Sequence, residues 1–492
     1  MTDLSGQLLD FDYSLVLPEI IAVLFAMIVV GADAFKVQLK LPSQIALALT
    51  IVGIVCALVA SLTIGLNHDG NFAGLIILDS FTTFFRVLFY GVTLTIVLGS
   101  HEYISKYVSH IGEFYGLLIL ATLGAVLMAS AGELLTAYLG IELLSFSLYI
   151  AVSLTKGDLR SNEASLKYVL LGGVASASLL YGLSLLYGVS GSTDYSEIAS
   201  ALSGSISDLE PTLLLGLVMI IVGLGFKASA VPFHMWTPDA YEGAPIPVTA
   251  FLSATSKAAT VAILLRWFGG PLLPIAGDWQ MIFSALAVAT MVVGNLVALQ
   301  QTNIKRLLAY SSIGQMGYML MAVVAVGSGY VDIATSGVLV HLAGYIITNI
   351  LVFVGVTHFF NNEESEEISA FKGLAQTSPY LALLITAGLF SLAGMPLLVG
   401  FFTKFILFQA IVSAGHLGLV VVAVIASTVS LYYYLMVIRQ MYLYEPEDSS
   451  KKLSLTTSGY LTTLVLFVAM VVLGLWGAPL YEVADTAATS LF

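Results

Sequence analysis

The chain has 492 residues, of which 59% are hydrophobic and only 10% are charged. This composition leaves too little polar surface for a water-soluble fold of this length, so the sequence is that of a membrane protein. A net charge of −13 without a basic patch argues against a nucleic-acid partner. The single cysteine, Cys56, excludes disulfides and cysteine-ligated iron–sulfur clusters built by this chain alone.

Apolar runs long enough to cross a hydrocarbon core of about 30 Å as helices recur along the whole chain, and there are about fourteen of them. The first seven are expected at 14–34, 43–66, 75–100, 112–131, 133–155, 162–189 and 211–230, the last with a continuation to 244. The other seven are expected at 247–268, 279–302, 305–327, 331–359, 379–413 with a break, 417–443 and 456–478. The sequence therefore predicts an all-α polytopic membrane protein.

The basic residues predict the orientation of these spans. With an even number of helices, most of the 17 Lys and Arg residues fall on the loops or span ends of one face. They are Lys36, Lys40, Lys106, Lys156, Arg160, Lys305, Arg306, Lys372, Arg439, Lys451 and Lys452. The opposite face receives only Arg266. Because basic residues accumulate on the cytoplasmic side, we expect both termini to be external.

Five basic residues lie within spans instead, and they need partners. They are Arg86, Lys167, Lys227, Lys257 and Lys404. A charged lysine at the centre of a membrane helix costs about 3 kcal/mol. We therefore expect the fold to place counter-charges or water beside these residues. Asp79 lies seven residues before Arg86 on one helical face, which predicts a structural pair. Glu19 is expected near a span end, within reach of water.

The spacing of the buried polar residues suggests an internal repeat. Glu142 and Gln315, Lys167 and His341, and Lys227 and Lys404 are each separated by roughly 175 residues, as in transporters built from repeats. We expect two five-helix repeats, 112–268 and 279–443, the second inverted. An N-terminal three-helix segment, 1–111, precedes them and a C-terminal helix, 444–492, follows.

Each repeat contains an interrupted helix, marked by AVPFHMW at 230–236 and AGMPLLVG at 393–400. A proline frees a backbone carbonyl, which inside a membrane is tolerated only where protein or water surrounds it. These two breaks therefore predict polar cavities.

The buried charges favour proton transfer. Glu142 shares a helical face with Ser145, and Lys257 shares one with Thr249 and Ser253. Burial disfavours the charged form of a lysine and a nearby carboxylate favours it, so a lysine whose distance to Glu142 changes can bind and release a proton. A static Glu142–Lys227 ion pair is the alternative. His234 and His341 are equally consistent with hydrogen-bonded packing residues.

The stretches GFKASAVPFHMWTPDAYEGAPIPVTAFLSATSKAA at 225–259, NIKRLLAYSSIGQMGY at 303–318 and AGMPLLVGFFTKF at 393–405 resemble the antiporter-like membrane subunits of respiratory complex I. The N type is favoured, because the M type has a glutamate where Lys404 stands. The resemblance implies proton translocation driven by electron transfer elsewhere in the complex. By motif, it assigns the proton path to Glu142, Lys167, Lys227, His234, Lys257 and Lys404. His341 is added as a candidate because of its place in the repeat, opposite Lys167.

The resemblance also implies a setting for the chain. The chain itself binds no cofactor, and quinone or phenazine and iron–sulfur or flavin groups belong to partner subunits. M-, K- and J-type membrane subunits and lipid are the expected neighbours, with the hydrophilic redox arm linked indirectly. A prokaryotic plasma membrane is expected, in preference to a thylakoid membrane.

Two other functions share this fold. One is a subunit of a multisubunit Na⁺/H⁺ antiporter that has no redox partner. The other is a structural scaffold between pumping subunits, in which the buried lysines would be dispensable.

Overall fold

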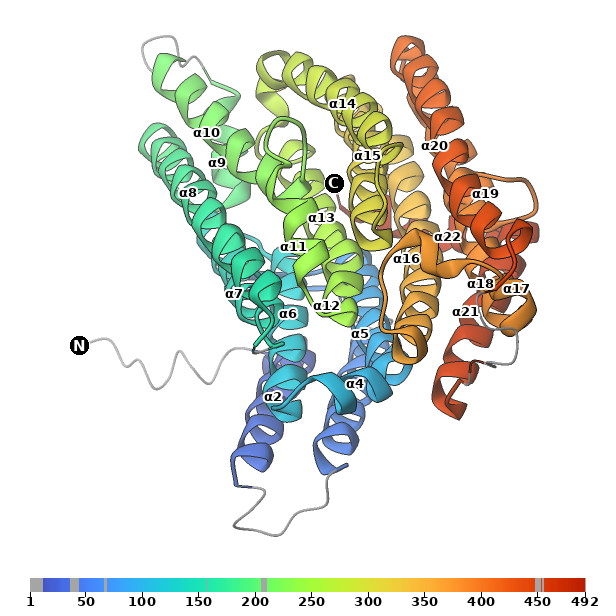
Figure 1. The fold of residues 1–492 in the computed structure, drawn as a ribbon. Coiled ribbons are helices and arrows are strands. Elements are labelled where there is room, and N and C mark those ends of the chain that lie inside the picture. The colour runs from blue at the N-terminus through green and yellow to red at the C-terminus, as the bar shows by residue number, and fades with distance from the viewer. Residues whose placement is uncertain are drawn as a thin grey trace.

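The computed structural model describes residues 12–35, 44–65, 69–155, 157–204, 210–446, 453 and 455–491. These residues form a bundle of long helices with one short hairpin (Figure 1). Five residues used to predict the orientation lie outside the described ranges. They are Lys36, Lys40, Lys156, Lys451 and Lys452.

The N-terminal segment comprises three long helices and a hairpin. Its elements are η1 (Tyr13–Val16), α2 (Leu17–Ala34), α4 (Ile45–Gly65), β1 (Gly70–Phe72), β2 (Ile76–Leu78) and α5 (Ser80–Tyr107). The antiparallel hairpin, with Gly70 opposite Leu78, was not predicted from the sequence. It leads into Asp79, whose carboxylate caps α5 by accepting the Thr82 N–H at 2.6 Å.

The segment expected as the first repeat contains the first broken helix. Its elements are α6 (Ile111–Ser130), α7 (Leu134–Val152), α8 (Leu159–Ser190), α9 (Tyr195–Leu202), α10 (Glu210–Ala228), α11 (Trp236–Gly243), α12 (Ile246–Phe251), the π-helical turn η2 (Leu252–Ser256) and α13 (Lys257–Phe268). Pro247 is the second residue of α12, in the first turn, where its missing N–H costs nothing. The predicted continuation to 244 corresponds to α11, which is a separate short helix.

The remaining elements contain the second break. They are η3 (Leu273–Ile275), α14 (Ala276–Ala298), α15 (Ile304–Gly327), α16 (Val331–Glu363), η4 (Ile368–Phe371), α17 (Leu374–Thr377), α18 (Pro379–Ala393), α19 (Val399–Ser413), α20 (Leu417–Leu443), α21 (Thr457–Leu475) and α22 (Ala478–Thr489). Gly394 ends α18 at φ +90°, a conformation that glycine adopts without a Cβ penalty. The short helix α22 was not expected.

The predicted fold class is confirmed. Thirteen helices in the described ranges are long and apolar enough to cross a membrane, and the expected span at 379–413 is the broken pair α18 and α19. The segment Ile246–Phe268 is completely buried and α15 and α16 are nearly so, whereas α8 and α20 lie at opposite sides of the bundle (Figure 1). The polar residues of the central helices are therefore shielded by a ring of other helices.

Two buried ion pairs differ from the one predicted. Arg86 does not pair with Asp79. Its guanidinium lies 2.6 Å from Glu19 of α2, and both side chains are buried. Asp79 pairs instead with Arg266 at 3.0 Å. Seven residues advance a helix by about 10 Å, too far for direct contact, and Asp79 precedes α5, where its carboxylate turns to the helix start. Glu19 is consequently shielded from water, not exposed to it.

The Arg86–Glu19 pair predicts an asymmetry between single and double variants. Arg86→Met leaves a buried carboxylate without a counter-charge and should lower the free energy of unfolding by about 3 to 5 kcal/mol. The double variant Arg86→Met with Glu19→Gln removes both charges and should be considerably more stable than the single one. Thermal unfolding of the detergent-extracted protein measures both. Equal melting temperatures for the single and double variants would contradict this account.

Candidate functional site

The first break, between α10 and α11, is an ordered turn held by polar contacts. Ser229 follows the last residue of α10 at φ +56°. The Trp236 indole N–H donates to the Phe226 carbonyl at 2.9 Å, and the Thr237 hydroxyl donates to Ser229 at 2.7 Å. These bonds fasten the start of α11 to the end of α10. The break thus brings backbone carbonyls and hydroxyls into the interior of the bundle.

Lys227 lies in the last turn of α10 and is 5% exposed. Its ammonium donates to the Ser145 hydroxyl of α7 and lies 5.7 Å from the centre of the Tyr149 ring. Glu142, one turn before Ser145, accepts from the Ser176 hydroxyl of α8. Among the described residues, no Glu142–Lys227 ion pair within 4.0 Å is formed, and the Lys227 ammonium binds the Ser145 hydroxyl instead of the carboxylate.

Lys257 reaches the same break from the other side. It is 2% exposed and begins α13, directly after the π-helical turn, a feature that often occurs at functional sites. Its ammonium is 3.4 Å from the carbonyl oxygen of Ala228, the residue that ends α10. A cation at a helix C-terminus is favourable because the terminal carbonyls carry partial negative charge. Lys227 and Lys257 are therefore both placed at one break, Lys227 within the last turn of α10 and Lys257 against the carbonyl of its final residue.

The second break, between α18 and α19, repeats this arrangement. The Lys404 ammonium is 2.8 Å from the Leu392 carbonyl oxygen and 3.3 Å from that of Ala393, at the end of α18. It also donates to the Ser427 hydroxyl of α20 at 3.0 Å. Lys404 is 5% exposed. In both breaks, then, a buried lysine binds the freed carbonyls of an interrupted helix.

The two predicted histidines differ in their surroundings. His341 of α16 is buried, with Nδ1 3.3 Å from the Thr403 hydroxyl next to Lys404. His234 lies within the first break. Within the described part of the chain, neither the Nε2 of His341 nor the buried Nδ1 of His234 has a hydrogen-bond partner. Both are thus placed beside a lysine-containing break, and neither is a fully satisfied packing residue.

Two polar residues that the sequence analysis did not identify connect α16 with the turn before Lys257. The Tyr345 hydroxyl donates to the Ser253 carbonyl at 3.1 Å, and the Asn349 amide donates to the Ser253 hydroxyl at 2.5 Å. Both extend from α16 to the turn that precedes Lys257. His341, Tyr345 and Asn349 are spaced four residues apart, so they share one face of α16. That spacing was the signal that could have identified them.

Lys167 is the exception among the predicted site residues. Its side chain is 47% exposed and forms ion pairs with Glu163 at 2.8 Å and Asp239 at 2.9 Å. The expectation of a buried lysine is therefore wrong. The 32 residues of α8 span about 48 Å, more than a membrane core requires, and Lys167 lies only two turns from its start. The carboxylate of Asp239 is near enough to neutralise it there.

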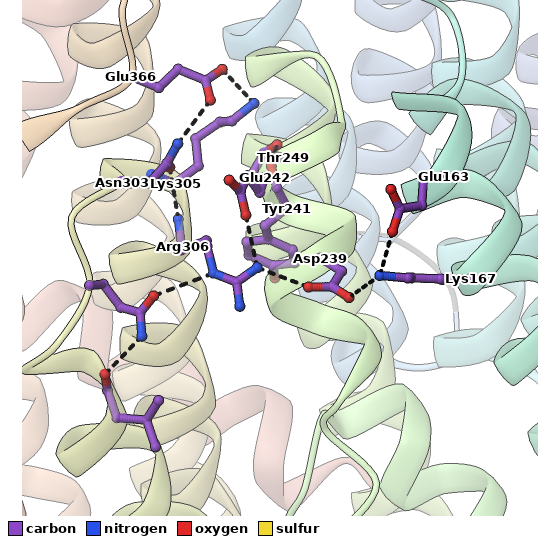
Figure 2. A network of polar contacts seen from close by, with 12 residues as sticks. Glu163, Lys167, Asp239, Tyr241, Glu242, Thr249, Asn303, Lys305, Arg306 and Glu366 are labelled. Carbon is purple, nitrogen blue, oxygen red and sulfur yellow. Dashed lines mark hydrogen bonds and ion pairs between the residues drawn. The ribbon is translucent and has the colours of Figure 1, made fainter. Parts of the chain in front are cut away.

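Asp239 and Glu242 of α11 extend this contact into a chain of alternating charges. Arg306 of α15 lies 2.9 Å from Asp239 and 2.8 Å from Glu242 (Figure 2). Burial alone would raise the pKa of Asp239, but the hydrogen bonds and positive charges of Lys167 and Arg306 lower it below its ordinary value. The short helix α11 is thus fixed by cations from both sides.

Charged residues gathered at the breaks of discontinuous helices define a class of antiporter-like membrane proteins. Residues 131–430 match the family described as NADH:quinone oxidoreductase/Mrp antiporter, TM. NADH-quinone oxidoreductase subunit N of Moorella thermoacetica is 44% identical over 86% of this chain and 88% of its own length. The chain therefore belongs to this family.

Solved structures agree with the family assignment. A chain of respiratory complex I from Thermus thermophilus with bound aureothin superposes with a TM-score of 0.77 at 32% identity, over 94% of this chain and 99% of that one. A chain of the Mrp complex from Dietzia sp. superposes with a TM-score of 0.83 at 22% identity, over 96% of this chain and 97% of that one. At that identity the second match establishes the fold alone.

The lowered pKa of Asp239 predicts a pH-dependent contribution to stability. A carboxylate whose pKa is depressed by folding stabilises the protein above its ordinary pKa, and this contribution is lost as the pH falls through the depressed value. Asp239→Asn should therefore cost about 1 kcal/mol at neutral pH and nothing once the wild-type carboxyl is protonated. Melting curves at neutral pH and at about pH 3 would test this. A difference of unchanged size at acid pH would contradict it.

Proposed function

We propose that this chain is the N-type membrane subunit of an NADH-quinone oxidoreductase of the complex I type and that it moves protons across the membrane. The observation that carries the proposal is that Lys227, Lys257 and Lys404 are buried and held by hydroxyls and backbone carbonyls, and that none of them forms an ion pair with a carboxylate among the residues that the structure describes. An ammonium fixed by a neutral group retains a strong tendency to lose its proton in a low-dielectric interior.

The two breaks give the lysines a route for exchange. Lys227 lies in the last turn of α10 and Lys257 binds the carbonyl of the final residue of that helix, so a proton released by one crosses the polar region of this break to reach the other. Glu142 acts on Lys227 through space, because it lies one turn from Ser145, the residue that Lys227 binds. Moving this carboxylate nearer would favour the charged form of Lys227 and moving it away would favour release. His234 and the face of α16 that carries His341, Tyr345 and Asn349 line the route toward Lys404.

Electron transfer would occur on other subunits. We assign no cofactor to this chain and place quinone or phenazine and the iron–sulfur or flavin groups on its partners. M-, K- and J-type subunits would flank it within a prokaryotic plasma membrane, with lipid on the remaining faces. Lys167, bound at the surface end of α8, would contribute through its contact with Asp239 instead of carrying a proton itself.

The second candidate is a subunit of a Na⁺/H⁺ antiporter without a redox partner, because the Mrp chain shares the fold. The 44% and 32% identities to oxidoreductase subunits favour the first function over the 22% identity to the Mrp chain. Affinity purification of the tagged chain from its own membranes separates the two. Co-purified hydrophilic iron–sulfur subunits support the oxidoreductase, and an assembly without them supports the antiporter.

Two neighbouring serines of α7 offer a matched test of the proton exchange between Lys227 and Lys257, which we call the relay. Ser145→Ala removes the hydroxyl that binds Lys227, whereas Ser147→Ala removes one that donates to the Leu143 carbonyl of its own helix at 2.7 Å. Ser145→Ala should slow NADH-driven proton pumping about tenfold, and Ser147→Ala should leave it within about twofold of wild type. Lys227→Ala and Glu142→Ala should depress pumping at least as strongly as Ser145→Ala. Normal pumping by both would refute the relay.

A further inference from the structure

A cavity of about 540 Å³ opens beside α11 and is lined by polar and charged side chains. It lies where α5, α11 and α15 meet the loop after α16. Five carboxylates face it, from Asp158, Glu242, Glu364, Glu366 and Glu367, together with the cations of Arg160 and Lys305. This excess of negative charge raises the local concentration of protons. By the positive-inside argument, the cavity lies on the cytoplasmic face.

Glu366 differs from the other carboxylates in its partner. Glu242 and Glu364 pair with Arg306 and Lys106, which are partly or largely exposed. Glu366 pairs with Lys305 at 2.6 Å, and the Lys305 side chain is only 3% exposed. The second carboxylate oxygen of Glu366 accepts from the Asn303 amide at 3.2 Å (Figure 2). This pair therefore links the cavity to the buried side of the bundle.

On that side, Lys305 contacts the segment that leads to Lys257. Its ammonium donates to the carbonyl of Ala244, the residue that caps α11, at 2.9 Å. Residue 246 begins the next helical segment, on which Thr249, Ser253 and Lys257 follow at intervals of four. Each interval advances the helix by about 6 Å, so these polar groups form a stripe from the cavity to the first break. Thr255, in the π-helical turn η2, has a buried hydroxyl that finds no partner among the described residues.

We propose that Glu366 and Lys305 are the proton-uptake pair of this subunit. Glu366 takes a proton from the cavity, and Lys305 passes its own proton inward along the stripe to the neutral amine of Lys257. The protonated Glu366 then returns its proton to Lys305, which restores the ion pair. The net change is one proton moved from the cavity to Lys257, with no other atom or electron transferred. This inference rests on the proposed function of the buried lysines.

The test uses the assembled complex in membrane vesicles whose cytoplasmic face is outward. NADH and a quinone are the substrates, and a dye reports the internal pH. Glu366→Gln should lower the initial rate of proton uptake about tenfold, because it removes the proton acceptor. Glu366→Asp should recover most of that rate. Glu367→Gln neutralises the neighbouring carboxylate of the same cavity without touching Lys305, and should remain within about twofold of wild type.

A second variant separates uptake from stability. Glu366→Gln leaves the Lys305 ammonium buried without a counter-charge, which alone can prevent assembly. The double variant Lys305→Met with Glu366→Gln removes both charges, and should assemble but pump at the same low rate. Failure of the double variant to assemble would make the pair structural and overturn the proposal.

Glu142→Ala serves as the reference for the relay itself. If Glu366→Gln or the double variant pumps normally while Glu142→Ala does not, the relay stands and the uptake pair is wrong. If Glu142→Ala pumps normally as well, the proposed function fails, and the uptake pair fails with it. A low rate in Glu366→Gln, recovery in Glu366→Asp and a normal rate in Glu367→Gln together support the pair.

Discussion

The structure depends on how an ammonium group is held where water is scarce. An isolated buried charge is prohibitively unfavourable, and a close carboxylate would fix the proton permanently. The chain uses a third arrangement, in which an interrupted helix presents free carbonyls to a lysine. Lys257 binds the end of α10 and Lys404 binds the end of α18. Partial charges of this kind stabilise the ammonium without a full counter-charge, as the proposed proton exchange requires.

Fully charged pairs occupy different places and have a different role. Arg86 with Glu19 joins two helices of the N-terminal segment, and Asp79 with Arg266 joins that segment to α13. Lys167, Asp239, Arg306 and Glu242 connect α8 and α15 through the short helix α11. These contacts hold helices whose positions determine the geometry of the first break. Ion pairs therefore hold the helices in position, whereas the lysines bound only by partial charges lie in the polar regions between these helices.

Much of the site could be predicted from its residue types. Lysines in apolar runs are costly, so their presence alone indicated a polar interior, and the prolines marked the helix breaks beside them. The prediction failed where it assigned partners. Asp79 was paired with Arg86 along one helix, yet each charge found its partner on another helix. Tyr345 and Asn349 were overlooked because an uncharged stripe resembles ordinary packing until its contact with Ser253 is seen.

The sequence by itself determined that the chain crosses the membrane, approximately where each membrane-spanning helix runs, and which residues carry charge into the interior. These properties follow from hydrophobicity and local backbone preference, which act over a few turns of helix. Only the tertiary structure decided that Lys227 binds Ser145 and not Glu142, that Lys167 is half exposed, and that Lys305 is buried against Glu366. Those contacts join residues far apart in the chain, and their geometry is fixed by how the helices pack.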